Sequence, residues 1–220
     1  MNLCSSRWPE VVFVTGIGTD VGKSYATGWL ARVLSSETGK RVITQKFIQT
    51  GNKDFSEDIA VHRRLMGIPM QTVDRLHITA PIIFSYPASP DLASRLDGRE
   101  LDLHIVDEAT STLQKEYDFV LVEGAGGIMV PLKDDYLTID YIIDRKLPTV
   151  VVTNGQLGSV SDTLLTLSAI REAGIALAAV VYNPYFDKDK TISDDSREYL
   201  RRWTMERFPD AMFIEMPQSL

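Results

Sequence analysis

The chain has 220 residues, of which 44% are hydrophobic, and a formal net charge of −7. This length suits one domain with a sizeable core, so we expect residues 1–220 to form a single domain. The negative charge argues against a nucleic acid partner, because such affinity comes mainly from Lys and Arg that replace condensed counterions. The single cysteine, Cys4, cannot form an internal disulfide, and no uninterrupted apolar stretch of about 18 residues occurs, so we expect a cytoplasmic protein without a membrane partner.

Short apolar runs alternate with helical patterns along the chain. Runs rich in β-branched residues predict strands at 11–15, 41–46, 118–123, 148–153, 177–183 and 211–215. Amphipathic patterns predict helices at about 23–36, 57–66, 103–115, 137–145, 160–173 and 192–207. Near-continuous apolar strands are typical of a parallel sheet that is covered on both faces. We therefore expect an α/β fold with three layers, a P-loop fold whose mostly parallel central sheet has helices on both faces and binds ligands at the carboxyl ends of its strands.

Residues 68–99 form a long segment with weak periodicity and four prolines. Structureless segments of this length are usually functional or flexible. We expect this segment to cover the edge at which the strands end.

The segment GIGTDVGKS, residues 16–24, joins a predicted strand to a predicted helix. In this context backbone N–H groups and the positive helix end can hold phosphate oxygens, while Lys23 reaches the terminal phosphates and Ser24 ligates magnesium. Five residues separate Gly16 from Gly22, so the loop is longer than the common pattern, and an ordinary glycine-rich turn is the alternative. We expect a bound nucleotide to contact Gly18, Thr19, Asp20, Val21, Gly22, Lys23, Ser24 and Tyr25.

Polar residues also follow two other predicted strands. Lys46 and Thr50 follow the second strand, where Lys46 would bring a second ammonium to the terminal phosphate unless it is a solvated charge. Glu123 ends a strand directly before three glycines, and an acid there is costly to bury unpaired. Asp58 lies near a helix start, where it could equally be a helix cap. Ser24, Asp58 and Glu123 together offer the oxygen ligands that magnesium prefers, so we expect them to form a metal site.

The histidines are scattered and have no nucleophile partner pattern. We therefore expect a structural or surface role for His62, His77 and His104.

These motifs resemble those of the dethiobiotin synthetase family. The resemblance covers nearly the whole chain and is carried by TGIGTDVGKS, QKFIQTG, SED, YPASPDLAS, VEGAGGIMVPL, LGSVSDTLLT and VVYNPY. It implies an ATP-dependent cyclo-ligase that uses MgATP, carbon dioxide and 7,8-diaminononanoate and releases dethiobiotin, ADP and phosphate. A carbamate on one amine would be converted to a carbamic-phosphoric anhydride, which the second amine attacks. The resemblance implies that Lys23, Lys46 and Thr19 take part in catalysis, and that Thr19 and Thr50 contact substrate or phosphate.

The resemblance also implies a site for the nucleotide base. Asn183 and Pro217 match adenine-binding positions, although Asn-Pro is also a good turn. The chain departs from the family where Phe47 replaces the usual proline and Ser24 replaces the more frequent threonine. Because the chain stops at Leu220, soon after Pro217, we expect an open base pocket that accepts other triphosphates besides ATP.

The segment QLGSVSD resembles the part of the family that meets the substrate carboxylate across a homodimer interface. A helix N-terminus suits an anion, and the matching residues are Gly158, Ser159 and Val160. Tyr199 would face the same substrate tail, with core packing as the alternative. The resemblance therefore implies a homodimer that acts on a small-molecule substrate.

Two other classes with a related fold fit the sequence less well. A partitioning or septum-positioning ATPase would carry a lysine next to the first glycine of its phosphate loop, where this chain has Ile17. The synthetase half of a cobyrinate-type amidotransferase would need a glutaminase domain with a Cys–His pair, which the single cysteine cannot supply.

Overall fold

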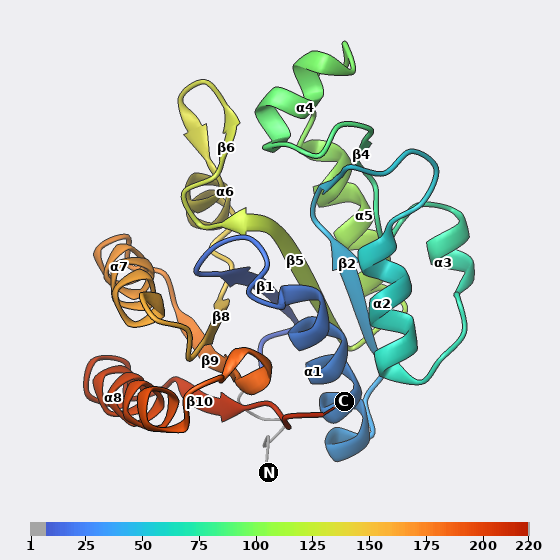
Figure 1. Ribbon diagram of the computed structural model, residues 1–220. Helices are drawn as coiled ribbons and strands as arrows, with labels where there is room; N and C mark the ends of the chain where they lie inside the picture. Colours follow the sequence, from blue (N-terminus) through green and yellow to red (C-terminus); the bar gives the residue numbers. More distant parts are fainter. Residues whose placement is uncertain (1–7, 220) are drawn as a thin grey trace.

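The computed structural model describes residues 8–219, so Cys4 lies outside the described residues. Within that range the main sheet has six strands in the order β10-β9-β8-β1-β5-β2, and each neighbouring pair is parallel (Figure 1). The strands are β1 (Val11–Gly16), β2 (Val42–Lys46), β5 (Phe119–Gly127), β8 (Thr149–Asn154), β9 (Leu177–Asn183) and β10 (Met212–Glu215). The prediction of a parallel sheet built from these six segments is confirmed.

Helices separate the strands and cover both faces of the sheet (Figure 1). They are α1 (Lys23–Thr38), α2 (Glu57–Met66), α3 (Thr72–Arg75), α4 (Pro90–Leu96), α5 (His104–Gln114), α6 (Thr138–Asp144), α7 (Ser159–Glu172) and α8 (Lys190–Arg207). A short 3-10 helix, η2 (Pro184–Phe186), follows β9. Each of the six helices expected from the sequence is present, so the expected three-layer architecture is confirmed.

The two faces of the sheet build two separate apolar cores, because successive side chains of a strand point in opposite directions. In β1, Val12 and Val14 pack toward α1 with Trp29 and Leu30, whereas Phe13 packs toward the helices of the other face. The same alternation runs through β5, β8 and β9. Burial on both faces explains why these strands have near-continuous apolar sequences.

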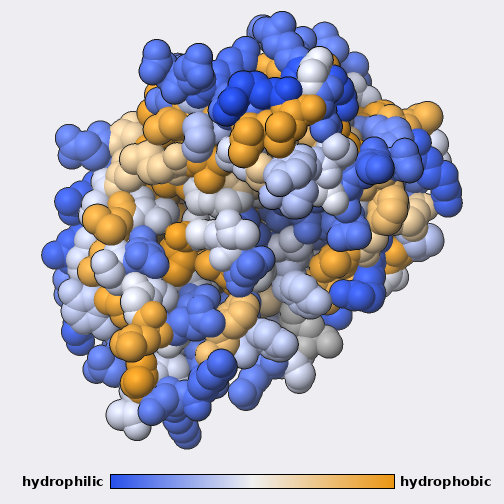
Figure 2. Space-filling model, turned by 45° about the horizontal axis from the view of Figure 1, so that its top comes forward, coloured by the Kyte–Doolittle hydropathy of each residue, from blue (hydrophilic) through white to orange (hydrophobic). Residues whose placement is uncertain are grey.

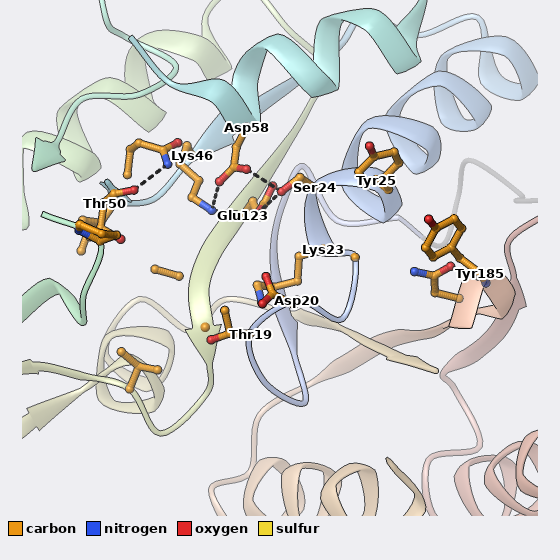
Figure 3. Close-up of a pocket in the computed structure, with 18 of the residues that line it drawn as sticks. Thr19, Asp20, Lys23, Ser24, Tyr25, Lys46, Thr50, Asp58, Glu123 and Tyr185 are labelled. Atoms are coloured by element: carbon orange, nitrogen blue, oxygen red, sulfur yellow. Dashed lines mark hydrogen bonds and ion pairs between the residues drawn. The ribbon is translucent and has the colours of Figure 1, made fainter. Parts of the chain in front are cut away.

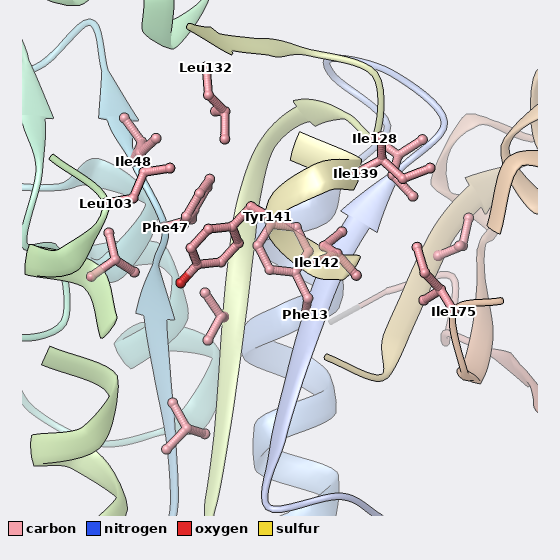
Figure 4. Close-up of a cluster of buried hydrophobic side chains, with 14 of the residues drawn as sticks. Phe13, Phe47, Ile48, Leu103, Ile128, Leu132, Ile139, Tyr141, Ile142 and Ile175 are labelled. Atoms are coloured by element: carbon pink, nitrogen blue, oxygen red, sulfur yellow. The ribbon is translucent and has the colours of Figure 1, made fainter. Parts of the chain in front are cut away.

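Phe47 directly follows β2 and is fully buried. Its ring centroid lies 5.3 Å from that of Phe13 and 4.6 Å from that of Tyr141, within the cluster drawn in Figure 4. Its backbone N–H donates to the carbonyl of Glu123 at 2.8 Å. The residue that replaces the usual proline is therefore part of the core, and it also joins β2 to β5 beside the cavity described below.

Helix α2 has clear signals at both ends. The side chain of Ser56 accepts a hydrogen bond from the N–H of Ile59 and caps the helix start, and Gly67 ends the helix in the left-handed conformation with a φ of 71°. Asp58 therefore lies in the first turn and is not the cap, so the capping alternative is wrong and its role as a magnesium ligand stays a prediction.

The segment 68–99 is more ordered than its sequence suggested. It contains α3, α4 and the two-residue strand β4 (Ile83–Phe84), which pairs in parallel with β3 (Gln49–Thr50). The carbonyl of Thr79 accepts a hydrogen bond from the N–H of Lys46 at 2.6 Å. The segment thus lies against the end of β2, which confirms that it covers a strand edge. Its helices and strand were not predicted, because elements of so few residues cannot show a period in the sequence.

Two shorter strands, β6 (Pro131–Lys133) and β7 (Tyr136–Leu137), form an antiparallel pair between β5 and α6. Among the helices of residues 8–219, none is long and apolar enough to cross a membrane. On the face shown in Figure 2, hydrophobic side chains form small separate groups among hydrophilic ones.

Candidate active site

A cavity of about 1130 Å³ lies at the carboxyl ends of the strands. Its wall includes Thr19 after β1, Lys46 at the end of β2, Glu123 in β5 and Asn183 at the end of β9. Of the residues predicted to form the site, the cavity brings together Thr19, Asp20, Gly22, Lys23, Ser24, Tyr25, Lys46, Thr50, Asp58, Glu123, Asn183 and Pro217. Figure 3 shows the polar side chains between Thr50 on one side and Tyr185 on the other.

The phosphate loop depends on residues with positive φ. Gly22 has a φ of 88° and precedes α1, and Asp20 adopts a φ of 60° although it is not glycine. A Cβ at Gly22 would lie 2.2 Å from Nδ2 of Asn183, so only glycine fits where the loop approaches the end of β9. Lys23 Nζ donates to the carbonyl of Gly18 at 2.7 Å, which turns the ammonium toward the loop's own backbone.

The pKa of Lys23 lies below that of a free lysine. Burial lowers its pKa, the charges of Glu123 and Asp58 oppose that effect, and the charge of Lys46 adds to it, so that the pKa is about 8. Because Lys46 acts on the pKa of Lys23, the two ammonium groups share one electrostatic environment. Lys23 and Lys46 both line the cavity, and their joint action on the terminal phosphate stays a prediction.

The register of the sheet places Lys46 directly beside Glu123, since the two residues are partners across β2 and β5. Lys46 Nζ lies 2.8 Å from Glu123 Oε1 and 2.5 Å from Asp58 Oδ2. The Ser24 hydroxyl lies 2.8 Å from Asp58 Oδ1 and 3.0 Å from Glu123 Oε1. These groups converge, as the dashed lines in Figure 3 show, so Lys46 is not a solvated charge.

The same cluster suits magnesium. A hydroxyl and two carboxylates are hard oxygen donors, and magnesium in such sites usually completes its shell with phosphate oxygens and water. No group of three or more His, Cys, Asp or Glu residues able to hold a metal occurs between residues 8 and 219. The oxygen donors of Ser24, Asp58 and Glu123 are of the kind that magnesium prefers, and their role as a metal site stays a prediction.

Both charged partners at the centre of the cluster keep their charge. Burial alone would raise the pKa of Glu123, but the charge of Lys46 and the hydrogen bond from His62 outweigh it and hold the pKa far below its usual range. Burial would lower the pKa of Lys46, but the charges of Glu123 and Asp58 raise it above its ordinary value. The site thus contains a stable ammonium between two carboxylates.

His62 is a residue whose contact the sequence did not reveal. It is fully buried, and its Nε2 lies 2.5 Å from Glu123 Oε2, so of the structural or surface roles expected for the histidines it takes the structural one. The other two differ, because His77 has a positive φ of 57° and the side chain of His104 is 84% exposed. One signal was present in the sequence: His62 follows Asp58 by four residues, which places both on one face of α2.

Aromatic and amide groups form the other end of the cavity. Asn183 Nδ2 donates to the carbonyl of Val21, and Asn183 Oδ1 accepts from the N–H of Tyr185, each at 3.1 Å. The amide therefore fixes the loop to η2 and keeps one N–H and one lone pair for a ligand. Residues at this end that the sequence did not identify are Tyr185, Phe186, Met216, Gln218 and Ser219.

The remaining wall also includes residues that carry no chemical signal in the sequence. Most are apolar or small, and their place follows from their position at strand ends or in the 68–99 segment: Ile48, Gln49, Pro87, Ala88, Ser89, Pro90, Ala125, Gly126 and Val130.

Some predicted residues lie outside the cavity wall. Gly18 and Val21 take part through their carbonyls, as described above. Within the single chain, the cavity wall does not include Gly158, Ser159, Val160 or Tyr199. Ser159 is buried and its hydroxyl donates to the carbonyl of Asn154 at 2.6 Å. Tyr199 is 39% exposed, so core packing is wrong as its alternative role, and contact across a dimer stays a prediction for these residues.

Two solved structures have a similar fold. A ParA family ATPase from Chlorobium tepidum has a TM-score of 0.53 at 16% identity, and the match covers 96% of this chain and 86% of that one. A plasmid partition protein from Borrelia burgdorferi, bound to AMPPNP, has a TM-score of 0.57 at 14% identity, with 96% and 89% covered. At these identities the likeness shows a shared P-loop fold.

Sequence comparison identifies much nearer relatives. A family model described as an AAA domain matches residues 10–207. The ATP-dependent dethiobiotin synthetase BioD 2 of Pasteurella multocida is 41% identical over 207 residues, which cover 94% of this chain and 97% of the relative. The ATP-dependent dethiobiotin synthetase BioD of Chlorobaculum tepidum is 47% identical over 191 residues, covering 87% and 80%. The site geometry and these identities lead to one conclusion: the chain belongs to the dethiobiotin synthetase family.

Proposed function

We propose that the chain catalyses the ATP-dependent carboxylation and ring closure of 7,8-diaminononanoate with carbon dioxide, giving dethiobiotin, ADP and phosphate in biotin synthesis. The observation that carries this proposal is the position of Lys46, whose ammonium shares Asp58 and Glu123 with the phosphate-loop residue Ser24. A phosphate loop alone fits many nucleotide-binding proteins, whereas a second buried ammonium beside it fits the transfer of phosphate to an anionic acceptor.

The reaction balances without a protein nucleophile. One amine of the substrate attacks carbon dioxide and loses a proton, which gives a carbamate. A carbamate oxygen then attacks the γ-phosphorus of ATP and ADP leaves. The second amine attacks the carbon of the resulting carbamic-phosphoric anhydride, phosphate leaves, and the loss of a second proton completes the cyclic urea.

The chain contributes charge and position to these steps. Lys23 and Lys46 stabilise the carbamate and the transferring phosphoryl group, while Thr19 and Thr50 contact substrate or phosphate at the part of the cavity beyond the lysines. Ser24, Asp58 and Glu123 hold magnesium, which offsets negative charge on the phosphates when it is bound. The adenine base of ATP binds at the end of the cavity that is lined by Pro217 and Asn183.

The substrate tail is proposed to reach a second copy of the chain. The predicted tail-binding residues lie outside the cavity of their own chain, three of them at the start of α7 and Tyr199 on α8. Leu157 beside that helix start is 89% exposed and Leu165 on α7 is 68% exposed, which suits a surface that is covered in a homodimer. A cytoplasmic location stays a prediction from the sequence.

The function is tested by measuring ADP, phosphate and dethiobiotin release by the purified protein with ATP, magnesium and bicarbonate. We expect turnover to require both 7,8-diaminononanoate and magnesium, with one ADP and one dethiobiotin formed together. ATP hydrolysis that is unchanged when the diamine is omitted would contradict the proposal and favour a switch ATPase.

A further inference from the structure

A chain of buried polar side chains leads from Glu123 away from the cavity and into the space between α2, β2 and α3. Its members beyond Glu123 are His62 and Arg63 of α2, Thr44 of β2 and Asp74 of α3, and all of them are buried. These members lie outside the sequence motifs that carry the family resemblance. Buried polar groups are costly unless they are fully hydrogen-bonded, so such a chain calls for a physical explanation.

The two oxygens of Glu123 have different partners. Oε1 lies 2.8 Å from Lys46 Nζ and 3.0 Å from the Ser24 hydroxyl, on the side of the cavity. Oε2 lies 2.5 Å from Nε2 of His62, on the side of the buried chain. The histidine contact therefore decides which oxygen remains available to the site.

Both ring nitrogens of His62 have a buried partner. The carboxylate of Glu123, paired with Lys46, can only accept, so Nε2 carries a proton and donates to Oε2. The hydroxyl of Thr44 lies 2.9 Å from Nδ1 on the other side of the ring. Nη1 of Arg63 donates to the same hydroxyl oxygen at 2.7 Å and so fixes its position.

Arg63 is itself held in place by two parallel hydrogen bonds to Asp74. Nε lies 2.9 Å from Oδ2 and Nη2 lies 2.7 Å from Oδ1. Nη2 also donates to the carbonyl of Thr44 at 3.2 Å. Asp74 accepts further bonds from the Thr79 hydroxyl at 2.6 Å and the N–H of Gln71 at 2.7 Å. A bidentate pair of this kind fixes direction as well as distance.

Close packing of two helices brings His62 to this position. Gly28 of α1 lies against α2, and a Cβ there would be 2.9 Å from Cα of His62. The backbone that carries His62 is therefore set by helix contact, and its side chain is set by Thr44. Neither constraint depends on a bound ligand.

We propose that His62 is a positioning residue, whose Nε2–H holds Oε2 of Glu123 so that Oε1 stays directed at Ser24 and Lys46, and that Thr44 and Arg63 fix the orientation of its ring. The proposal rests on the proposed function, in which Glu123 is a magnesium ligand. Hydrogen-bond partners of metal ligands typically affect metal affinity or activity by about 10- to 100-fold when they are lost. His62 is expected to fall in that range.

The hydrogen bond from Nε2 is tested on the protein itself, without metal or substrate. In protein labelled with ¹⁵N-histidine, a long-range ¹H–¹⁵N spectrum distinguishes protonated from unprotonated ring nitrogens, and the signals that vanish in His62→Gln belong to His62. We expect Nε2 of His62 to carry a proton. In Thr44→Val, which removes the partner of Nδ1, we expect the ring signals of His62 to change. An unprotonated Nε2 in the unaltered protein, or a spectrum unchanged in Thr44→Val, overturns the proposal.

The effect on the reaction is tested with two variants at residue 62. A glutamine amide can donate near the place of Nε2, whereas leucine cannot. We expect His62→Leu to lower kcat and to raise the magnesium concentration for half-maximal rate, each by about 10- to 100-fold. The KM for the diamine should change little, and His62→Gln should recover most of the loss. His104→Leu, which alters an exposed histidine, is the matched control and should behave like the unaltered protein.

The outcomes separate the two proposals. Equal kinetics for His62→Leu and the unaltered protein, or equal impairment in the Leu and Gln variants, overturns the positioning role. If turnover of the unaltered protein does not depend on magnesium or on the diamine, the proposed function fails instead, and the spectrum still decides whether Nε2 carries a proton. If His62→Leu does not fold, the Thr44→Val spectrum and the His62→Gln kinetics decide.

Discussion

Individual side chains in this site are fixed by partners that lie far away in the sequence. Lys46 and Glu123 are 77 residues apart, yet strand register makes them neighbours at 2.8 Å. The sequence predicted both residues, because each ends an apolar strand in a sheet that binds ligands at that edge. It could not predict that Lys46 would contact Asp58 as well, since that contact depends on how α2 packs against α1.

The first prediction concerns Lys46. Changing it to alanine removes a charge that can offset negative charge on the transferring phosphoryl group, so we expect kcat to fall about a thousandfold or more. Nucleotide binding should largely survive, because the phosphate loop and Lys23 remain. Steady-state kinetics and calorimetric ATP titration measure the two effects separately.

Lys53→Ala is the matched control, since Lys53 is an exposed lysine close by in the sequence. It should retain normal turnover. Near-normal kcat in Lys46→Ala would remove this side chain from the reaction.

The second prediction concerns the proton on Lys23. Its pKa is about 8, and a bound triphosphate favours the charged ammonium, so binding should raise the pKa and take up a proton near pH 8. ATP affinity should then weaken as the pH rises above about 8, where the free protein loses this charge. Calorimetric binding enthalpies in buffers of different ionisation enthalpy count the protons directly.

Lys23→Arg provides the comparison, because a guanidinium stays charged throughout this range. Its binding enthalpy should not depend on the buffer. Buffer-independent enthalpies for the unaltered protein at this pH would contradict the assigned pKa.

At the scale of elements, the contact between α1 and α2 places both Asp58 and His62. The sequence predicted the two helices from their apolar periods, and in the structure each ends at a glycine with positive φ, Gly39 and Gly67. It did not predict the close approach at Gly28, because a glycine inside a helix indicates only a lower helix propensity. Short elements such as α3 and β4 were also missed, since a few residues cannot display a period.

The third prediction tests this contact with Gly28→Ala. Alanine normally favours a helix by about 0.5–1 kcal/mol over glycine, but here its Cβ would lie 2.9 Å from Cα of His62. We expect the clash to win and to lower the free energy of unfolding by about 1–3 kcal/mol. Urea denaturation measures the change.

Ser36→Ala, at an exposed position of the same helix, is the control and should be neutral or slightly stabilising. If Gly28→Ala instead gains stability, as the helix propensity of alanine alone would suggest, the close packing of α1 against α2 is contradicted.

For the whole molecule, the sequence predicted the order of strands and helices, both apolar faces and the central polar residues of the site. This succeeded because the near-continuous apolar strands, the phosphate loop and VEGAGG are local signals. The wall formed by residues such as Pro87, Tyr185 and Met216 was not predictable, because it arises only when distant segments fold together. That residues 1–220 form one domain and pair as a homodimer stays a prediction.

The fourth prediction addresses the homodimer. Leu165 is 68% exposed on α7, and a carboxylate there would be buried without a partner if that surface is covered by a second copy. We expect sedimentation velocity to show a particle of twice the chain mass for the unaltered protein and a single chain for Leu165→Glu.

Leu76→Glu, at another leucine that is 64% exposed, should leave the particle unchanged. If the unaltered protein sediments as a single chain at the concentrations used to measure activity, the dimer is ruled out.

The ammonium of Lys46 supplies a resident counter-charge to Asp58 and Glu123. Without a nearby positive charge, these two carboxylates would repel each other in the folded protein. In many metal proteins the bound ion removes this repulsion, whereas here the ammonium of Lys46 does so. A chelator should therefore halt turnover yet leave the melting temperature of the enzyme where it was.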